Sequence, residues 1–408
     1  MTKLNELIQQ FCPDGVEYKT LGSFATISRG GNFQKKDFRD DGFPCIHYGQ
    51  IYTKYGLFVD KTVSFISPAC ASKQKTASKN DIIMAVTSEN IEDVCKCIVW
   101  LGDGEVAVSG HSAIIRHSQN PKYLAYYFHS RMFFDQKRKL AHGTKVIEVT
   151  PDKLASVKIP LPPIEVQREI VHILDNFTEL TAELTAELTA RKKQYEYYRD
   201  KLLAYNYDVE LFTISDIAET SIGLATSVSQ HKRENGVILL HNSDIQQNKI
   251  VLKTVEYISK EFAQKNKKKV LRKGDIITVH TGDVGTSAVI DDEYDGAIGF
   301  TTITTRIKDT ARVNPYFLCH YLNSHKCKQD IASMTISDRS NLNQKSFNTI
   351  QIPVPPLEIQ NRIVNVLDNF DAICSDLKIG LPAEIAARQK QYEFYRDKLL
   401  TFKEQKSK

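Results

Sequence analysis

Residues 159–177 read Ile159-Pro-Leu-Pro-Pro-Ile-Glu-Val-Gln-Arg-Glu-Ile-Val-His-Ile-Leu-Asp-Asn-Phe177, and residues 352–370 read Ile352-Pro-Val-Pro-Pro-Leu-Glu-Ile-Gln-Asn-Arg-Ile-Val-Asn-Val-Leu-Asp-Asn-Phe370. Twelve of the nineteen positions are identical. A second block, Arg191 to Leu203, returns as Arg388 to Leu400 with eleven of thirteen positions identical. A period of about 190 residues is far longer than a solenoid repeat. The sequence therefore indicates a domain duplication.

The segment after the first Pro-Pro pair is predicted to be one long helix. Residues 165–203 contain neither Pro nor Gly, and a Pro just before them suits a helix start. Forty residues at about 1.5 Å each would span roughly 60 Å. Apolar residues recur at steps of three, four and seven, which is the pattern of an amphipathic helix, at Ile170, Ile173, Phe177, Leu180, Leu184, Leu188, Tyr195, Tyr198 and Leu202.

Two further features describe the helical segments. A tandem tetrapeptide, Thr-Ala-Glu-Leu, fills residues 181–188, and each copy lengthens a helix by roughly 6 Å. The second segment, 358–400, is interrupted by Gly380-Leu381-Pro382, which predicts a kink or a restart. Because both segments carry apolar seams, we expect them to pack as an antiparallel coiled coil.

The portions that precede these helices read as α+β domains. Residues 16–158 and 209–351 contain short β-rich runs separated by Gly, Asp and Ser turns, followed by one helical stretch each. The predicted organisation is a first globular domain over 1–158, a first spacer helix over 159–205, a second globular domain over 206–351 and a second spacer helix over 352–408. The predicted fold class is α+β, with a pseudo-twofold internal repeat.

The composition sets limits on function. The 408 residues carry a net charge of +5 and are 41% apolar, which excludes a polycationic tail and an acidic disordered protein. The N-terminus lacks a signal-peptide core, and no run of 18 apolar residues occurs, so we expect a soluble, cytoplasmic protein. The eight cysteines include only one close pair, Cys95 and Cys97, so no zinc site is predicted.

Catalytic motifs are absent from the sequence. There is no Walker A loop, and residues 280–286 contain glycines without the strand–GxGxxG–helix context of a dinucleotide site. His47 and His241 occupy equivalent repeat positions, but no nucleophile, base and orienting group assemble around them. No catalytic residue and no metal ligand are predicted.

Loops of the variable portions suit nucleic acid. Residues 34–36, 136–145 and 265–273 are basic, and residues 337–345 supply amide and hydroxyl side chains. Cations bind phosphates whatever the base sequence, whereas Asn, Gln, Arg, Ser and Thr in the grooves discriminate between bases. Clusters of this kind at comparable places in both repeats favour DNA binding.

With its duplicated Pro-Pro-x-Glu-x-Gln helix starts and its paired Lys-Gln-Tyr-Glu-(Tyr/Phe)-Tyr-Arg-Asp-Lys-Leu-Leu endings, the chain resembles the specificity subunit of type I restriction–modification enzymes over nearly its whole length. The resemblance implies two target recognition domains, each reading one half of a split, asymmetric double-stranded DNA target. It implies a non-catalytic subunit that recruits two modification (methyltransferase) subunits and restriction subunits. The partners, and not this chain, would use S-adenosylmethionine, ATP and Mg²⁺.

Individual residues are predicted for two roles. The nominated DNA contacts are Lys35, Lys36, Tyr48, Gln50, Ser88, His111 and Lys145 in the first domain, and Asn242, Asp244, His280, Thr281, Arg339 and Asn341 in the second. The nominated subunit interface lies on the repeated helical motifs, at Gln167, Tyr195, Tyr198, Arg199, Gln360, Tyr392, Tyr395 and Arg396.

Two alternative readings remain open from the sequence. One is the specificity protein of a smaller restriction system in which another subunit fuses methylase and nuclease. The other is a coiled-coil scaffold with two ligand-binding domains and no DNA role, which would show no salt-dependent binding to duplex DNA.

Overall fold

The computed structural model describes residues 2–204, 209–334, 341–376 and 378–405. Contacts divide the chain into two compact units: Met1–Leu184 together with Ile385–Lys408, and Thr185–Glu384. Both divisions fall inside long helices. Each unit therefore contains one variable portion, a helical segment from its own repeat and a helical segment from the other repeat.

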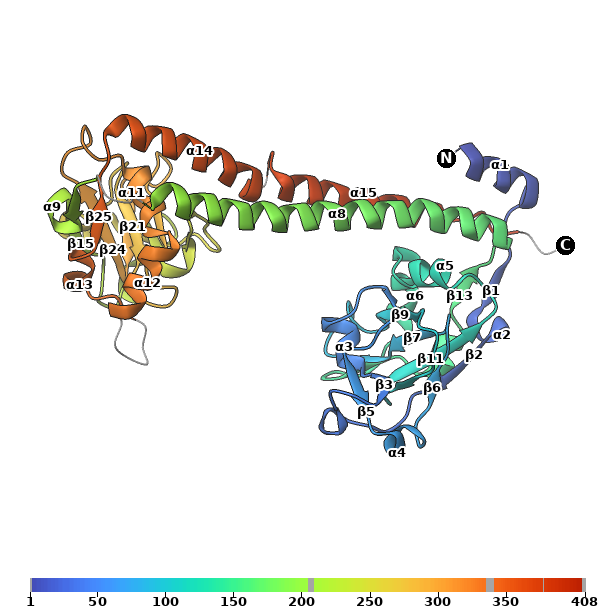
Figure 1. Ribbon diagram of the computed structural model, residues 1–408. Coiled ribbons are helices and arrows are strands. Elements are labelled where there is room, and N and C mark those ends of the chain that lie inside the picture. Colours follow the sequence, from blue (N-terminus) through green and yellow to red (C-terminus); the bar gives the residue numbers. More distant parts are fainter. Residues whose placement is uncertain (1, 205–208, 335–340, 377, 406–408) are drawn as a thin grey trace. The chain divides into compact units, whose positions relative to one another are not determined.

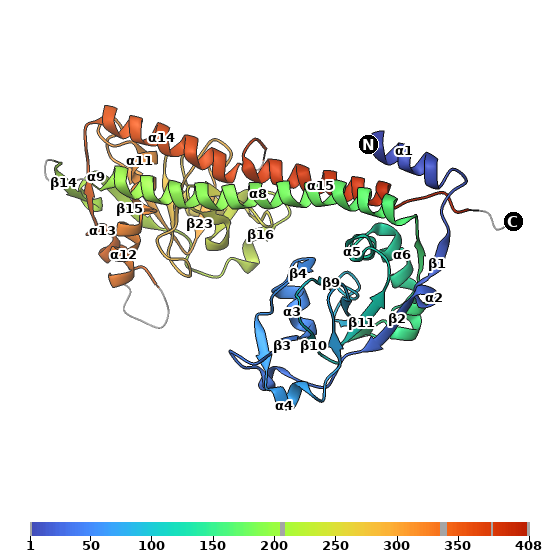
Figure 2. The ribbon, with the colours of Figure 1, turned by 45° about the vertical axis from the view of Figure 1, so that its right-hand side comes forward.

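The first unit contains two sheets. The five-stranded sheet has the order β2-β11-β7-β9-β4, and the four-stranded sheet has the order β5-β3-β10-β6. Figure 2 marks β2, β11, β9 and β4 of the first sheet and β3 and β10 of the second. The strands are β1 (Tyr18–Thr20), β2 (Ala25–Arg29), β3 (Phe43–Ile46), β4 (Phe58–Val59), β5 (Ser64–Ile66), β6 (Thr76–Ala77), β7 (Ile82–Ala85), β8 (Thr87–Ser88), β9 (Cys97–Trp100), β10 (Val106–Val108), β11 (Ser112–His117), β12 (Ile147–Glu148) and β13 (Lys158–Pro160).

Helices cover these sheets and carry the chain to the long helix. All four residues of β7 and of β9 are buried, which explains why both runs are continuously apolar. The helices are α1 (Thr2–Phe11), α2 (Leu21–Phe24), α3 (Tyr48–Thr53), α4 (Pro68–Ala71), α5 (Pro121–Phe128), α6 (Arg131–Leu140), α7 (Pro151–Ala155) and α8 (Ile164–Leu203), with a 3-10 turn over Lys35–Asp37.

The second unit repeats this plan with sheets β15-β24-β21-β22 and β16-β20-β17-β23. Figure 1 marks β15, β24 and β21 of the first of these sheets. The strands are β14 (Leu211–Thr213), β15 (Ala218–Ile222), β16 (Lys232–Arg233), β17 (Val237–His241), β18 (Ile245–Gln246), β19 (Lys249–Ile250), β20 (Tyr257–Ile258), β21 (Ile276–Val279), β22 (Ser287–Val289), β23 (Ile298–Phe300), β24 (Thr302–Ile307) and β25 (Gln351–Pro353). The helices are α9 (Ile214–Ile217), α10 (Lys260–Lys265), α11 (Pro315–Leu322), α12 (His325–Met334), α13 (Gln344–Asn348) and α14 (Leu357–Ser375), with 3-10 turns over Ser229–His231, Asn242–Asp244 and Lys267–Lys269. Helix α15 (Leu381–Leu399) follows, and from Ile385 onward it belongs to the first unit.

Strand register confirms the duplication. Strand β10 runs parallel to β3, and β23 runs parallel to β17. Ile82 lies opposite Val99 in the first unit, and Ile276 lies opposite Val289 in the second. An ion pair is repeated as well: Asp81 with Arg116 at 3.0 Å, and Asp275 with Arg306 at 2.6 Å. The α+β fold class predicted from the sequence is confirmed.

The long helices follow the sequence pattern closely. Helix α8 runs unbroken over 40 residues, as the apolar spacing predicts. The second segment is broken into α14 and α15, and the break ends at Gly380. A Cβ at Gly380 would lie 2.6 Å from the carbonyl oxygen of Ala372, so only glycine allows this close approach.

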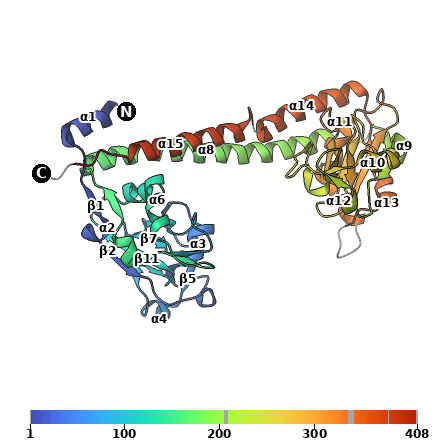
Figure 3. The same cartoon turned by 180° about the vertical axis from the view of Figure 1, so that it is seen from behind.

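Within each unit the helical segments pair in antiparallel fashion. In the first unit, Phe177 of α8 stacks on Tyr395 of α15 with ring centroids 5.4 Å apart. Further toward the start of α8, Ile170 and Leu174 share one core with Leu399. In the second unit, Tyr198 of α8 lies 5.9 Å from Phe370 of α14. Figures 1 and 3 show the helices of each pair running side by side.

The ends of the first unit are tied together by backbone hydrogen bonds. Val16 N–H donates to the carbonyl of Lys403 at 2.8 Å, and Gln405 N–H donates to the carbonyl of Val16 at 3.0 Å. Strand β1 pairs with β13, and β14 pairs with β25 in the second unit. Each pairing brings the start of a variable portion to its end, beside the beginning of a long helix.

Within the described ranges, no helix combines the length and apolar character needed to cross a membrane. The same ranges hold no group of three or more His, Cys, Asp or Glu side chains that could bind a metal ion. Burial raises the pKa of the Cys95 thiol to about 12. The Cys95–Cys97 pair therefore lies in an apolar core as protonated thiols.

Candidate nucleic-acid interface

The nominated residues of the first unit gather where β3 and β10 end. Tyr48 begins α3 one residue beyond the end of β3, after the capping residue His47, and its backbone N–H donates to Ser109 Oγ at 2.9 Å. Its ring lies 4.9 Å from that of His111, which is exposed. His111 Nδ1 lies 3.2 Å from Thr87 Oγ1, beside Ser88. The fold thus brings Tyr48, Ser88 and His111 together.

A short loop projects beside Ser88. Strand β12 pairs with β8, with Ile147 opposite Ser88, and the loop before it contains the exposed Lys145. Gly143 has φ +106°, and a Cβ there would lie 1.9 Å from the carbonyl oxygen of Val146. The base of the loop is held by an ion pair between Arg29 and Glu148. The glycine and the ion pair fix the conformation of this loop, which carries Lys145 two residues before the partner of Ser88, Ile147.

Lys35 and Lys36 lie in the 3-10 turn and are exposed. The pKa of His47 is lowered, first by burial and then by the positive charge of Lys35. His47 in turn lies 4.5 Å from Tyr48 between ring centroids. Lys35 therefore lies close enough for its charge to act on His47, which packs on Tyr48.

Gln50 differs from its nominated neighbours because it is buried. Its Nε2 donates to Ser64 Oγ at 2.7 Å, and its Oε1 accepts the backbone N–H of His47 at 2.9 Å. Both ends of the amide are occupied within the chain. In this conformation Gln50 supports the turn that carries Tyr48.

The equivalent corner of the second unit carries different chemistry. Asn242 follows His241, as Tyr48 follows the equivalent His47, and its Nδ2 donates to Thr301 Oγ1 at 3.1 Å. Thr301 has φ +52°, a strained conformation for a β-branched residue. Asp244 is buried, and its carboxylate accepts the backbone N–H of His241 at 2.9 Å. The scaffold is shared, and the exposed side chains differ.

A second group of nominated residues lies at the turn between β21 and β22. Thr281 Oγ1 donates to Asn341 Oδ1 at 2.6 Å, and His280 Nδ1 lies 3.0 Å from the same hydroxyl. Burial lowers the pKa of His280. Thr281 and Asn341 are exposed. Arg339, also nominated, lies outside the described residues.

The Gln of each Pro-Pro-x-Glu-x-Gln motif is a buried clamp. Gln167 Oε1 accepts the backbone N–H of Asn120 at 3.1 Å, and its Nε2 donates to the carbonyl of Pro162 at 2.8 Å. Gln360 makes the equivalent bonds to Asn314 at 2.8 Å and to Pro355 at 2.7 Å. Each clamp fastens the start of α5 or α11 to the start of a long helix. This role explains why the motif recurs.

The aspartate of each repeated ending, Asp200 or Asp397, binds the variable portion of the other repeat. In the second unit, Asp200 Oδ1 accepts the N–H of His325 at the start of α12. In the first unit, Asp397 Oδ1 accepts the N–H of Arg131 at the start of α6. Four nominated interface residues support these aspartates, with each Arg hydrogen-bonded to its Asp and packed over a Tyr ring, namely Tyr195, Arg199, Tyr392 and Arg396.

The two aspartates were not among the nominated residues. Their presence in both copies of the repeat is a signal that could have singled them out. Tyr198 and Tyr395 contribute to the helix pairs through Phe370 and Phe177. Most of the nominated interface residues therefore have contacts inside the chain.

The exposed side of the same motif is also repeated. Tyr197 is 60% exposed and Phe394 is 61% exposed, at equivalent positions. Lys201 lies over the Tyr197 ring, and Lys398 lies over the Phe394 ring, each at 5.8 Å. Each copy of the motif thus presents one exposed aromatic ring with a lysine.

Comparison with known proteins gives consistent matches. A family model described as the type I restriction modification DNA specificity domain matches the chain twice, over residues 13–191 and 206–387. A protein of Haemophilus influenzae named as a type I restriction enzyme specificity subunit is 32% identical over 318 residues, which cover 73% of this chain and 77% of that protein. The specificity subunit of a type I restriction enzyme of Escherichia coli is 34% identical over 263 residues, 60% of this chain and 63% of the relative.

Two solved structures share the fold. One, from a study of complex assembly and conformational transition of the type I restriction–modification system, has a TM-score of 0.67 at 20% identity and covers 95% of this chain and 98% of its own. The other, the S subunit of a type I restriction–modification system from M. genitalium, has a TM-score of 0.52 at 16% identity, covering 95% and 96%.

Proposed function

Because the chain belongs to the family of type I restriction–modification DNA specificity subunits, we propose that its two variable portions read the two unlike halves of a split, asymmetric DNA target. The chain is the DNA specificity subunit of such a system and is itself non-catalytic. Partner subunits use the cofactors: S-adenosylmethionine for methylation, and ATP with Mg²⁺ for translocation and cleavage.

One observation carries the proposal for two unlike half-sites. The equivalent histidines His47 and His241 each cap the turn that follows, and the next residue is Tyr48 in one unit and Asn242 in the other. Asn donates to and accepts from adenine in the major groove, whereas an aromatic ring offers stacking and apolar contact. Equivalent corners with unlike side chains favour unlike bases.

The proposed recognition domains are residues 1–158 and 206–351, joined by spacer segments 159–205 and 352–408. The nominated residues fall into two classes by charge. Lys35, Lys36 and Lys145 are exposed cations, which suit phosphates. The remaining exposed or half-buried members suit base edges, namely Tyr48, Ser88, His111, Asn242, His280, Thr281 and Asn341, with Arg339 proposed from sequence alone.

A pair of variants tests these classes in the assembled methyltransferase. His111→Ala is expected to relax one position of the methylated target, because a lost base contact costs about 1–3 kcal/mol. Lys35→Ala with Lys36→Ala is expected to weaken binding to all sequences and to reduce its salt dependence. The control is Lys79→Ala, because Lys79 forms an exposed ion pair at the opposite end of strand β7.

Methylation mapping and a DNA titration at two ionic strengths read the outcome. If both test variants kept the wild-type target sequence and the wild-type affinity, His111, Lys35 and Lys36 would not belong to the DNA interface. If Lys79→Ala lost as much DNA affinity as the double variant, the change would reflect only the removal of positive charge and not a contact at Lys35 and Lys36. Salt-independent binding by the wild type would contradict the DNA-reading function itself.

We further propose that two modification subunits dock on the two exposed copies of the helix motif. After a duplication, exposed side chains without a shared role are free to diverge. The motif nevertheless keeps Lys193/Lys390, Glu196/Glu393 and Lys201/Lys398 identical and an aromatic residue at 197 and 394. Two like surfaces suit two copies of one partner, and the nominated buried residues would contribute by fixing the helix that presents each surface.

The number of bound partners tests this docking proposal. Tyr197→Ala or Phe394→Ala alone is expected to leave one modification subunit per chain, and the double variant none, as measured by native mass spectrometry. Glu183→Ala, an exposed change on α8 outside the motif, serves as the control. Two bound partners in the double variant would contradict the assignment. We also propose that the restriction subunits join through the modification subunits.

A further inference from the structure

In the second unit, helix α8 is held by a run of hydrogen bonds whose direction is set by the backbone. Ser287 N–H donates to Asn323 Oδ1 at 3.0 Å, and Asn323 Nδ2 donates to the carbonyl of Ser287 at 2.8 Å. A backbone N–H can only donate and a carbonyl can only accept, so these contacts fix which way the Asn323 amide points.

The direction passes from Asn323 to the hydroxyl of Tyr195 on α8. Asn323 Nδ2 also donates to Asn248 Oδ1 at 2.7 Å. Asn248 Nδ2 therefore faces Tyr195 and donates to its hydroxyl oxygen at 2.8 Å. Because that oxygen accepts from Asn248, the hydroxyl hydrogen is free to be donated elsewhere.

The acceptor of that hydrogen is His320, which is only 2% exposed. Tyr195 OH lies 3.3 Å from His320 Nδ1, so Nδ1 must be unprotonated to accept. The imidazole hydrogen is then on Nε2, which donates to Asp368 Oδ1 at 2.8 Å. The run of bonds selects the neutral Nε2–H tautomer of His320.

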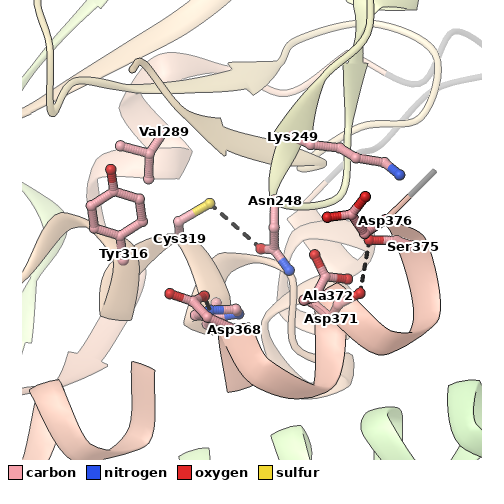
Figure 4. A pocket seen from close by; sticks show the side chains of 11 residues that line it. Asn248, Lys249, Val289, Tyr316, Cys319, Asp368, Asp371, Ala372, Ser375 and Asp376 are labelled. Atoms are coloured by element: carbon pink, nitrogen blue, oxygen red, sulfur yellow. Dashed lines mark hydrogen bonds and ion pairs between the residues drawn. The ribbon is translucent and has the colours of Figure 1, made fainter. Parts of the chain in front are cut away.

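Charged and titratable groups surround this imidazole from each packed element. Asp368 and Asp371 face it from α14, Tyr195 faces it from α8, and Lys249 lies on β19 across a pocket of about 350 Å³. Burial raises the pKa of Asp371. Figure 4 shows these carboxylates and Lys249 around the pocket, with the Cys319 sulfur directed at the Asn248 amide oxygen; Tyr316 and Cys319 belong to α11, the helix of His320 itself.

We propose that His320 is a positioning residue that holds α8 on the second variable portion through Tyr195, and that a proton taken up at Nδ1 releases this hold. With Nδ1 protonated, both Asn248 and His320 would donate to the Tyr195 oxygen. The tyrosine hydrogen would then lose its acceptor in a buried setting, which is unfavourable. The imidazolium would keep its bond to Asp368, with Asp371 near. Acid therefore loosens α8 while the contact between α11 and α14 persists.

The first unit contains the same arrangement with a tyrosine in place of the histidine. Tyr126 stands at the position equivalent to His320, and its hydroxyl donates to Asp175 Oδ1 at 2.6 Å. Tyr392 replaces Tyr195, and the rings of Tyr126 and Tyr392 lie 6.3 Å apart. The helical segment 388–399 of the same chain is therefore an internal control for segment 191–203.

Hydrogen exchange on the full chain, compared at pH 7.5 and pH 5.5, tests the proposal. The measurement uses a His129→Gln background, because burial lowers the pKa of His129 in the first unit to about 4 and acid would otherwise destabilise that unit as well. After correction for intrinsic rates, amide exchange in 191–203 is expected to rise about five-fold or more at pH 5.5, while 388–399 stays unchanged. His320→Tyr, which installs the first unit's residue, is expected to abolish the response. Tyr195→Phe is expected to give fast exchange in 191–203 at both pH values.

A spectroscopic signature of His320 covers the case in which a variant folds poorly. Nitrogen-15 spectra of histidine-labelled full chain are expected to show the Nε2–H tautomer of His320 at pH 7.5. The Nδ1–H tautomer, an equal response in both helical segments, or a response that persists in His320→Tyr would overturn the proposal. None of these measurements involves DNA, so their failure is distinct from a failure of the proposed function.

Discussion

Asp200 Oδ1 accepts the backbone N–H of His325 at 3.0 Å, although 125 residues separate them in the chain. A carboxylate at the N-terminus of a helix satisfies a free N–H and interacts favourably with the helix dipole. Arg199 holds the same carboxylate at 3.0 Å. The end of the first repeat's helix is thereby fixed to the second variable portion.

Replacing this carboxylate is expected to destabilise the second unit. Asp200→Ala should lower its free energy of unfolding by about 1–2 kcal/mol, and Asp397→Ala should do the same for the first unit. Asp200→Asn retains an acceptor and should lose about half as much or less. Pulse proteolysis in urea, read separately on fragments of each unit, measures the effect. A loss confined to the wrong unit would contradict the assigned contacts.

Gln167 and Gln360 offer a second pair of matched sites. Gln167→Met keeps the length of the side chain but leaves the N–H of Asn120 and the carbonyl of Pro162 without their partner. Buried polar groups left unpaired cost about 1–3 kcal/mol each, so a loss of about 2–4 kcal/mol is expected from either glutamine. Gln9→Met, at an exposed position, is the control. Chemical denaturation showing equal midpoints for all three variants would contradict the clamp.

The first unit should lose stability in acid through His129. Burial, and then the charges of Arg396, Lys137 and Lys96, lower the pKa of His129 to about 4 although a backbone bond to Ala125 opposes this. The unfolded chain takes up the proton near pH 6.5, and the folded chain does so only near pH 4. Stability therefore falls as the pH drops through this window, by up to about 3 kcal/mol.

The comparison of wild type with His129→Gln isolates this contribution. The variant is expected to show a smaller loss of unfolding free energy than the wild type between pH 7 and pH 4.5, measured by urea denaturation at each pH. Parallel stability curves for the two proteins would show that His129 does not titrate as described.

Lengthening α8 is expected to widen the gap between the half-sites. One additional Thr-Ala-Glu-Leu after Leu188 adds roughly 6 Å of helix, close to two base-pair steps of about 3.4 Å. Methylation mapping should show a longer gap and unchanged half-sites, because the inserted residues lie outside both variable portions. Glu183→Ala, which keeps the length, should leave the gap as it is. Altered half-site bases with an unchanged gap would contradict the expectation that the length of α8 sets the gap between the half-sites.

Local features were predictable from the sequence. The apolar spacing and the absence of Pro and Gly predicted α8 to within a residue, and Gly380-Leu381-Pro382 predicted the break before α15. These features depend on neighbours along the chain, since helix periodicity and backbone geometry act over a few residues. The twofold repeat likewise predicted two variable portions of like topology.

Long-range partners were not predictable in the same way. Asp200 and Asp397 look like ordinary charged residues of an exposed helix until the fold places a helix N-terminus beside them. Gln50 is another example: its amide bonds to Ser64 and His47, and no pattern near Gln50 in the sequence indicates these partners. Which polar side chains face outward depends on contacts between distant segments, and local pattern carries no information about those.

Helices α8 and α15 each have residues in both units. A loss of structure in one unit is therefore expected to affect the other. A helix forms cooperatively, so a segment that loses its packing in one unit tends to fray the adjoining segment in the other. A chain in which one variable portion is misfolded would then lose helix structure in the other unit as well. Under the proposed function, such a chain would lose its contacts to both half-sites together rather than keep those to one.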